Sequence, residues 1–450
     1  MSQSPDLQQL SQRLLEAAKQ AGAETADAIL IAGDAISIEV LDGKLEHAER
    51  AEGIDVGLRV LIGKKQANIA SSDVKPETFT TIAERAVAMA KVAPDDPFCG
   101  LADPDQLAQS WDVEALDLAD DTQSPEPPAL QEMALQAEAA ALDVKGVSKV
   151  QASGSGWSGT DVWLAGSHGF SAGYRRTSWS TSCVAITGEG LGMERDYYGD
   201  GRTHFEDLMD PSEIGRLAGE RTAAMAGATR PPTGTYPILI DERVSSSLIG
   251  HLTGAINGSS IARGSSWLID SLGSQVLPEH ISLVEDPHRA RVGGSRPFDA
   301  EGLPMQKRAI IENGVLTGWT LDLATARKLG MESTGNAARG ASAPPSPSTG
   351  NLELTQGDKS LEELLKDMGT GLWITSFIGS TISPTTGDYS RGASGFWVEN
   401  GEVTGPVNEC TVAGNLKDML LRIIPANDAR THLSRVIPSL LIEDMTIAGS

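Results

Sequence analysis

The sequence predicts an α+β protein with an N-terminal α+β unit, a middle α+β unit and a large C-terminal β-rich domain with short helices. Three observations predict this class. Short runs of alternating apolar and polar residues, typical of strands, lie between stretches with helical spacing. Proline-rich segments divide the 450 residues into units. Glycine occurs 48 times, which favours many tight turns.

The first unit, residues 1–93, begins with a predicted helix at Ser4-Pro5, because proline is favoured at the first helical position. Two alternating runs follow, and Asp42-Gly43 between them predicts a hairpin. A second helix is expected from Pro76. Residues 94–128 contain six prolines among acidic side chains, and they predict a linker.

The middle unit, residues 129–230, is expected to open with a helix that starts at Pro128, followed by a β-rich stretch. Asp210-Pro211-Ser212-Glu213 predicts a capping box and a helix to about Met225. The last unit, 231–450, should hold a strand at 236–240, a helix at 244–256 and a final strand. Further expected elements are hairpins at Asn313-Gly314 and Asn400-Gly401, and helices at 322–329, 360–368 and 415–422.

Charge excludes some partners. Lys plus Arg total 36 and Asp plus Glu total 61, so the net charge is −25. Nucleic acid and anionic membranes attract basic surfaces, so we expect neither as a partner. Residues 92–144 alone hold 13 carboxylates and no Lys or Arg, which indicates a solvated acidic segment.

The cysteines and the N-terminal residues indicate the cellular compartment. Cys99, Cys183 and Cys410 lie far apart, which is typical of neither a disulfide framework nor a cysteine metal site. The first 20 residues lack the apolar core of a signal peptide, and no apolar run is long enough to span a membrane. We therefore expect a cytoplasmic protein.

Motifs alone predict no catalysis. Residues 154–159 match G-x-G-x-x-G, but the strand-like residues after them favour a glycine-rich β segment over a dinucleotide site. Neither G-x-S-x-G nor a P-loop sequence occurs, and the seven histidines form no close ligand pair.

Three segments of the last unit resemble the TldD/PmbA family, also known as modulators of DNA gyrase. They are residues 245–273, residues 333–340 (STGNAARG) and residues 387–420, which begin GDYSRGASGFW. The order of three units also suits the family, so the resemblance covers nearly the whole chain. Within the family, the sequence is most similar to the PmbA (TldE) type of subunit.

The resemblance has consequences for metal binding. The TldD type of subunit is a zinc metallopeptidase with an H-E-x-x-x-H motif and a C-terminal cysteine ligand. The matching residues here are Gly250-His251-Leu252-Thr253-Gly254-Ala255. The two histidine-ligand positions are thus Gly250 and Ala255, His251 stands at the position of the catalytic glutamate, and no cysteine follows Cys410. The resemblance implies no metal or other cofactor in this chain, and zinc in a TldD-type partner.

The resemblance further implies a non-catalytic subunit of a heterodimeric metalloprotease that cleaves unfolded peptides, in peptide processing or antitoxin degradation. This chain would help to form the peptide cavity, and the isolated chain could form a homodimer. The candidate peptide-contacting residues are Asp388, Tyr389, Ser390, Arg391, Gly392 and Phe396.

Alternatives stay open at this point. Residues 388–395 also fit a structural turn. Gly250-His251 also fits a helix that packs at a domain or subunit interface. The chain could also be a self-sufficient hydrolase with an unrecognised site. A third possibility is a non-proteolytic modulator of DNA gyrase or of a toxin–antitoxin system.

Overall fold

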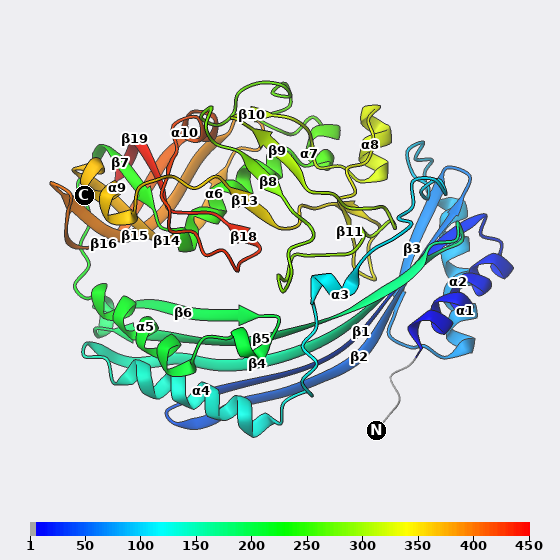
Figure 1. Ribbon diagram of the computed structural model, residues 1–450, viewed down its shortest axis with the longest axis horizontal. Helices are drawn as coiled ribbons and strands as arrows, with labels where there is room; N and C mark the ends of the chain where they lie inside the picture. The colour runs from blue at the N-terminus through cyan, green and yellow to red at the C-terminus, as the bar shows by residue number, and fades with distance from the viewer. Residues whose placement is uncertain (1–5) are drawn as a thin grey trace.

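The computed structural model describes residues 6–450 (Figure 1). It confirms an α+β protein with a large β-rich C-terminal region. The expected helix start at Ser4-Pro5 lies outside the described residues. The first described helix, α1 (Leu7–Ala21), begins after Asp6, whose carboxylate accepts a hydrogen bond from the Gln9 N–H at 3.0 Å. None of the described helices is both long and apolar enough to cross a membrane.

One curved sheet of six antiparallel strands forms the first half of the molecule (Figure 1). In spatial order its strands are β3 (Lys65–Ser71), β2 (Lys44–Ile62), β1 (Thr25–Leu41), β4 (Val147–Gly166), β5 (Ser171–Thr187) and β6 (Glu194–Arg202). The hairpin at Asp42-Gly43 joins β1 to β2, as expected. Because β1 pairs with both β2 and β4, the N-terminal and middle units share this sheet. The boundaries 1–93, 94–128, 129–230 and 231–450 stay a prediction about sequence units.

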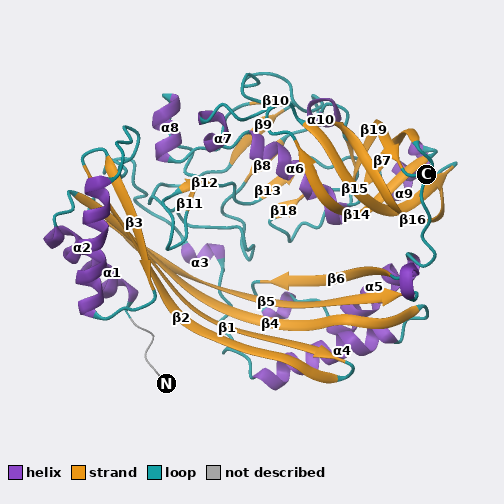
Figure 2. Cartoon of the chain, turned by 180° about the vertical axis from the view of Figure 1, so that it is seen from behind, coloured by secondary structure: helices purple, strands orange, loops and turns teal. Residues whose placement is uncertain are grey.

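Four helices cover the convex face of this sheet (Figure 2). Two of them, α1 and α2 (Pro76–Val92), pack together at one end. The other two, α4 (Pro127–Leu142) and α5 (Pro211–Ala224), pack together at the opposite end. Side chains alternate along a strand, so Leu30 packs among the helices while Ile29 points to the concave face. Two short 3₁₀ helices, η1 (Gly190–Gly192) and η2 (Phe205–Asp207), flank β6.

The acidic segment 94–128 packs against the rest of the protein. It contains the short helix α3 (Val113–Leu116), and Leu107, Leu116 and Leu118 are buried. The Thr177 N–H of β5 donates a hydrogen bond to the Leu118 carbonyl at 3.0 Å, and the Ala108 N–H donates to the Gly302 carbonyl at 2.9 Å. The segment therefore contacts both the first sheet and the third domain.

The third domain contains a second six-stranded sheet and several short strands. The large sheet has the order β16 (Glu402–Asn415), β15 (Asp388–Glu399), β14 (Gly371–Ile382), β7 (Gly234–Ile240), β19 (Leu440–Ala448) and β17 (Ile424–Pro425). A smaller sheet has the order β10 (Val315–Leu316), β9 (Arg308–Glu312), β8 (Leu283–Glu285), β13 (Leu352–Leu354) and β18 (Arg435–Val436). A third pair is β11 (Ala337–Ala338) with β12 (Ser346–Pro347). The helices are α6 (Glu242–Ala255), α7 (Gly258–Ala262), α8 (Leu323–Leu329), α9 (Leu361–Met368) and α10 (Leu416–Leu420).

Turn chemistry predicted the hairpins of this domain correctly. Asn400 and Gly401, between β15 and β16, have φ of 56° and 79°. Two successive positive φ angles characterise the type I′ turn that Asn-Gly favours. Asn313-Gly314 joins β9 to β10 in the same way. The prediction of a capping box at Asp210 is confirmed only for the Asp210 side chain. Asp210 caps α5 through the Ser212 N–H, but the Glu213 carboxylate pairs with Arg216 instead.

Candidate functional site

Helix α6 carries the segment that resembles the zinc motif. The Asp241 carboxylate caps it, accepting a hydrogen bond from the Arg243 N–H at 3.1 Å. Leu248, Ile249 and Leu252 are buried in the core of the third domain. Helical spacing therefore leaves Gly250 and His251 at the border of this core, where strands β15 and β18 contribute their neighbours.

His251 lies against an aromatic ring and near a cation. Its ring centroid is 5.9 Å from that of Tyr389 on β15, with the two planes at 71°. Burial and the nearby Arg391 charge lower the pKa of His251, which favours the neutral imidazole. Its Nε2 atom is buried, and no described residue bonds to it. Burial also raises the pKa of Tyr389 to about 12, so the phenol stays protonated.

Arg391 is held in place by three interactions. Its Nε donates a hydrogen bond to the Gly379 carbonyl at 2.9 Å, and Nη1 donates to Ser247 Oγ on α6 at 3.1 Å. Its guanidinium carbon lies 4.4 Å from the ring centroid of Phe377, a cation–π distance. The side chain therefore joins β15 to α6 beside His251.

Position 250 faces a second guanidinium. A Cβ atom built on Gly250 would lie 3.3 Å from Nη1 of Arg435 on β18. Ala255, at the other histidine-ligand position, is 5 % exposed and packs in the apolar core. A zinc ion needs several nitrogen, sulfur or oxygen ligands, and neither side chain offers one.

Cys410 supplies no zinc ligand either. It is buried on β16, where its Sγ donates to the Ala393 carbonyl at 3.2 Å. Burial raises the pKa of the thiol to about 11, so the thiol stays protonated in the core. Among residues 6–450, no group of three or more His, Cys, Asp or Glu side chains is arranged to hold a metal ion. The residues present at this place do not fit zinc.

The structure separates the six predicted peptide-contacting residues. All lie on β15, which pairs with β14 on one side and β16 on the other. Neither edge of β15 is free along most of this length, so contacts from it to a peptide would use side chains. Tyr389 and Arg391 face α6, whereas Asp388 accepts hydrogen bonds from Thr386 and Asn415 at the start of the strand. Phe396 packs on Trp373 at 5.2 Å and lines a separate cavity of about 540 Å³.

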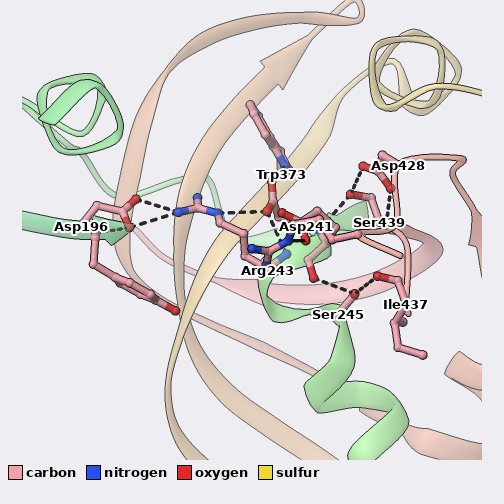
Figure 3. A network of polar contacts seen from close by, with 11 residues as sticks. Asp196, Asp241, Arg243, Ser245, Trp373, Asp428, Ile437 and Ser439 are labelled. Atoms are coloured by element: carbon pink, nitrogen blue, oxygen red, sulfur yellow. Dashed lines mark hydrogen bonds and ion pairs between the residues drawn. The ribbon is translucent and has the colours of Figure 1, made fainter. Parts of the chain in front are cut away.

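An ion network links the middle unit to the start of α6 (Figure 3). Arg243 contacts Asp196 of β6 at 3.1 Å and Asp241 at 3.0 Å. The Trp373 indole also donates to Asp241, at 3.1 Å. Burial alone would lower the pKa of Arg243, but the nearby carboxylates of Asp196 and Asp241 have the larger effect and raise it. The network fixes the orientation of α6 relative to the first sheet.

A cleft that the sequence did not reveal lies between the concave face of the first sheet and the third domain. It encloses about 440 Å³, within the range of about 300–1,000 Å³ that ligand sites occupy. Arg176, Arg296 and Arg435 line it. These arginines are far apart in the sequence and belong to no motif, so only the fold brings them together.

Comparison with known proteins defines the class of this chain. It matches the sequence models of three successive parts of one family: PmbA/TldA metallopeptidase domain 1 over residues 26–90, the central domain over 120–226 and the C-terminal domain over 233–449. The class is therefore that of three-domain proteins related to metallopeptidases.

Individual relatives agree. The chain is 38 % identical over 418 residues to the metalloprotease PmbA of Escherichia coli O157:H7, covering 92 % of this chain and 90 % of that protein. It is 35 % identical over 454 residues to a metalloprotease PmbA homolog of Haemophilus influenzae, covering 100 % and 97 %. The chain belongs to the PmbA/TldA metallopeptidase family, which confirms the resemblance to the TldD/PmbA family.

Solved structures share the fold. A Bacteroides thetaiotaomicron protein described as a modulator of DNA gyrase superposes with a TM-score of 0.90 at 26 % identity, covering 99 % of this chain and 100 % of that one. TldE of Thermococcus kodakarensis superposes with a TM-score of 0.84 at 20 % identity, covering 98 % and 100 %. The second likeness shows a common fold.

Proposed function

We propose that this chain is the non-catalytic, PmbA/TldE-like subunit of a zinc metalloprotease complex, and that a TldD-type partner holds the zinc. The observation that carries the proposal is the guanidinium of Arg435 beside Gly250, where the family resemblance places a zinc ligand. Arg391 adds a second positive charge near His251. Like charges repel, so these two guanidiniums disfavour a divalent cation at this place.

The chain would help to enclose a cavity for unfolded peptides, for peptide processing or antitoxin degradation in the cytoplasm. We propose side-chain contacts from the β15 residues, foremost Arg391, which is half-buried and could meet a substrate carboxylate. Asp388, Tyr389, Ser390 and Phe396 complete the proposed side-chain contacts, and Gly392, which has no side chain, allows a close approach of the backbone. Without its partner, the chain would form a homodimer.

The test starts from purified chains. This chain alone, this chain with a TldD-type chain from the same cells, and that chain alone are each given an unfolded peptide. We expect efficient cleavage only with both chains, and its loss on addition of a chelator. Metal analysis should find zinc in the complex and well under one zinc per chain in this subunit alone.

Two outcomes would overturn the proposal. Stoichiometric zinc in the isolated chain, with chelator-sensitive cleavage, would make it a hydrolase in its own right. Retention of DNA gyrase from a native extract, with no TldD-type chain, would favour a non-proteolytic modulator. The second outcome is motivated by the description of the structural relative from Bacteroides thetaiotaomicron.

A further inference from the structure

The cleft between the first sheet and the third domain has one apolar wall. Strands β1, β4 and β5 supply it from the concave face of the sheet, which lies below the third domain in Figure 1. The apolar side chains of this wall are Ile29, Ile31, Val162, Leu164 and Tyr174. A neighbouring cavity of about 330 Å³ shares Arg176, Gly293 and Ser434 with the cleft. The two cavities are thus adjacent, and together they suit an extended ligand.

Three guanidiniums in the cleft form no direct ion pair, although Arg296 attracts the buried Asp299 carboxylate from a longer distance. No described carboxylate lies within 4.0 Å of the guanidinium of Arg176, Arg296 or Arg435, although carboxylates outnumber Lys and Arg by 61 to 36. Arg176 donates to the Ser295 carbonyl at 2.8 Å, and its Nε atom is buried with no partner among residues 6–450. Arg296 donates to the Ala337 carbonyl at 3.4 Å, and Arg435, an exposed side chain, donates no hydrogen bond to the described residues.

Other charges around the cleft are already compensated. Arg339 pairs with Asp27. The lining carboxylate of Asp299 accepts hydrogen bonds from three backbone N–H groups, those of Glu301, Leu303 and Ala337. Unsatisfied charge in the cleft is therefore positive, and a ligand carboxylate would complement it.

The lining groups are divided unevenly between the two walls. The sheet supplies most of the apolar side chains together with Arg176, whereas the third domain supplies Arg296 and Arg435 together with Phe298. In an extended peptide, successive side chains point in opposite directions. A peptide in this cleft would place every second side chain on the sheet and the others toward Arg296 and Arg435.

We propose that the cleft binds an extended peptide segment in which acidic side chains alternate with apolar ones. The choice of a peptide as occupant rests on the proposed function. The charge pattern and the alternation rest on the cleft itself.

Binding to the isolated, full-length chain tests the proposal without any protease. The probe is a fluorescein-labelled hexapeptide, acetylated and amidated at its ends, in which Glu alternates with Leu. Fluorescence anisotropy measures its Kd. We expect at least tenfold weaker binding when Gln replaces Glu, because each carboxylate loses a charge-assisted hydrogen bond. A peptide of the same composition with all Leu before all Glu should also bind at least fivefold more weakly.

Variants locate the binding site. Arg435→Gln and Arg296→Gln should each weaken binding of the alternating peptide by about tenfold. Arg85→Gln, which removes an exposed arginine from α2, is the matched control and should change Kd by less than twofold. Circular dichroism and thermal unfolding confirm that the variants fold. Arg176 stays unchanged because its hydrogen bonds hold the loop at Ser295.

Several results would overturn the inference: no measurable binding of the alternating peptide, equal binding of the Glu and Gln peptides, or an equal loss in Arg85→Gln. These results concern this chain alone, whereas the proposed function depends on cleavage by the complex. Failure of one is therefore distinguishable from failure of the other.

Discussion

The guanidinium of Arg435 lies beside Gly250, with Nη1 3.3 Å from the place a Cβ atom on residue 250 would occupy. The two residues are 185 positions apart, on β18 and α6. Their contact puts a positive charge beside the position where the family resemblance places a zinc ligand. Arg435 therefore contacts α6 at Gly250 and also lines the cleft between the first sheet and the third domain.

This proximity predicts a measurable coupling. Gly250→Asp introduces a carboxylate beside Arg435, and we expect the pair to contribute about 0.5–1 kcal/mol to the free energy of unfolding. A double-mutant cycle with Arg435→Gln, in urea unfolding, isolates this value. Gly254→Asp is the control, because that position on the same helix has open space around it. Equal coupling at both positions would contradict the contact.

His251 should be dispensable for cleavage. We expect His251→Ala to leave kcat/KM of the assembled complex within about twofold, because this side chain serves no metal. The variant should lose about 0.5–1.5 kcal/mol of stability, since the edge-to-face contact with Tyr389 is removed. A loss of activity as deep as that caused by chelation, with assembly intact, would refute this expectation.

The ion pair of Arg339 with Asp27 should stabilise the contact between the first sheet and the third domain. Both side chains are buried, at 0 % and 6 % exposure, and Arg59 also pairs with Asp27. We expect Arg339→Gln to cost about 2–4 kcal/mol in urea unfolding, because it leaves a buried charge less well compensated. Arg175→Gln removes an exposed pair with Asp161 and should cost under about 1 kcal/mol. Similar costs for both variants would rule out this role.

Glu301 should make stability depend on pH. Burial, followed by the charge of Asp299, raises its pKa from 4.5 to about 8. The folded state then binds a proton that the unfolded state releases. Its contribution to stability is present below about pH 4.5 and is lost as the pH rises through about 8. The glutamine in Glu301→Gln is neutral at every pH. We therefore expect the free energy of unfolding of this variant to fall less between pH 5 and 8, by on the order of 2 kcal/mol.

Thermal unfolding at several pH values measures the effect of Glu301. Glu114→Gln serves as the control, because Glu114 is an exposed carboxylate on α3. An unchanged pH profile in Glu301→Gln would show that this carboxyl group titrates normally.

Local chemistry made much of the fold predictable. Asn400-Gly401 specifies a hairpin because its two residues tolerate positive φ, and Pro76 starts a helix because it lacks the N–H that would be unpaired there. The alternating runs at 36–40 and 54–60 were correctly assigned to strands. Their length was not predicted, because Gly33 and Gly53 interrupt the pattern within β1 and β2, where long-range pairing extends both strands.

The sequence by itself determined the family and the class of fold, and it led to the prediction that Gly250, His251 and Ala255 stand at the positions of the zinc motif. These features depend on residue identity and on short-range spacing. Only the tertiary structure decided that β1 and β4 share a sheet, that Arg435 lies beside Gly250, and that Arg176, Arg296 and Arg435 line one cleft. Such contacts join residues far apart in the chain, and strand pairing and core packing determine them rather than any local pattern.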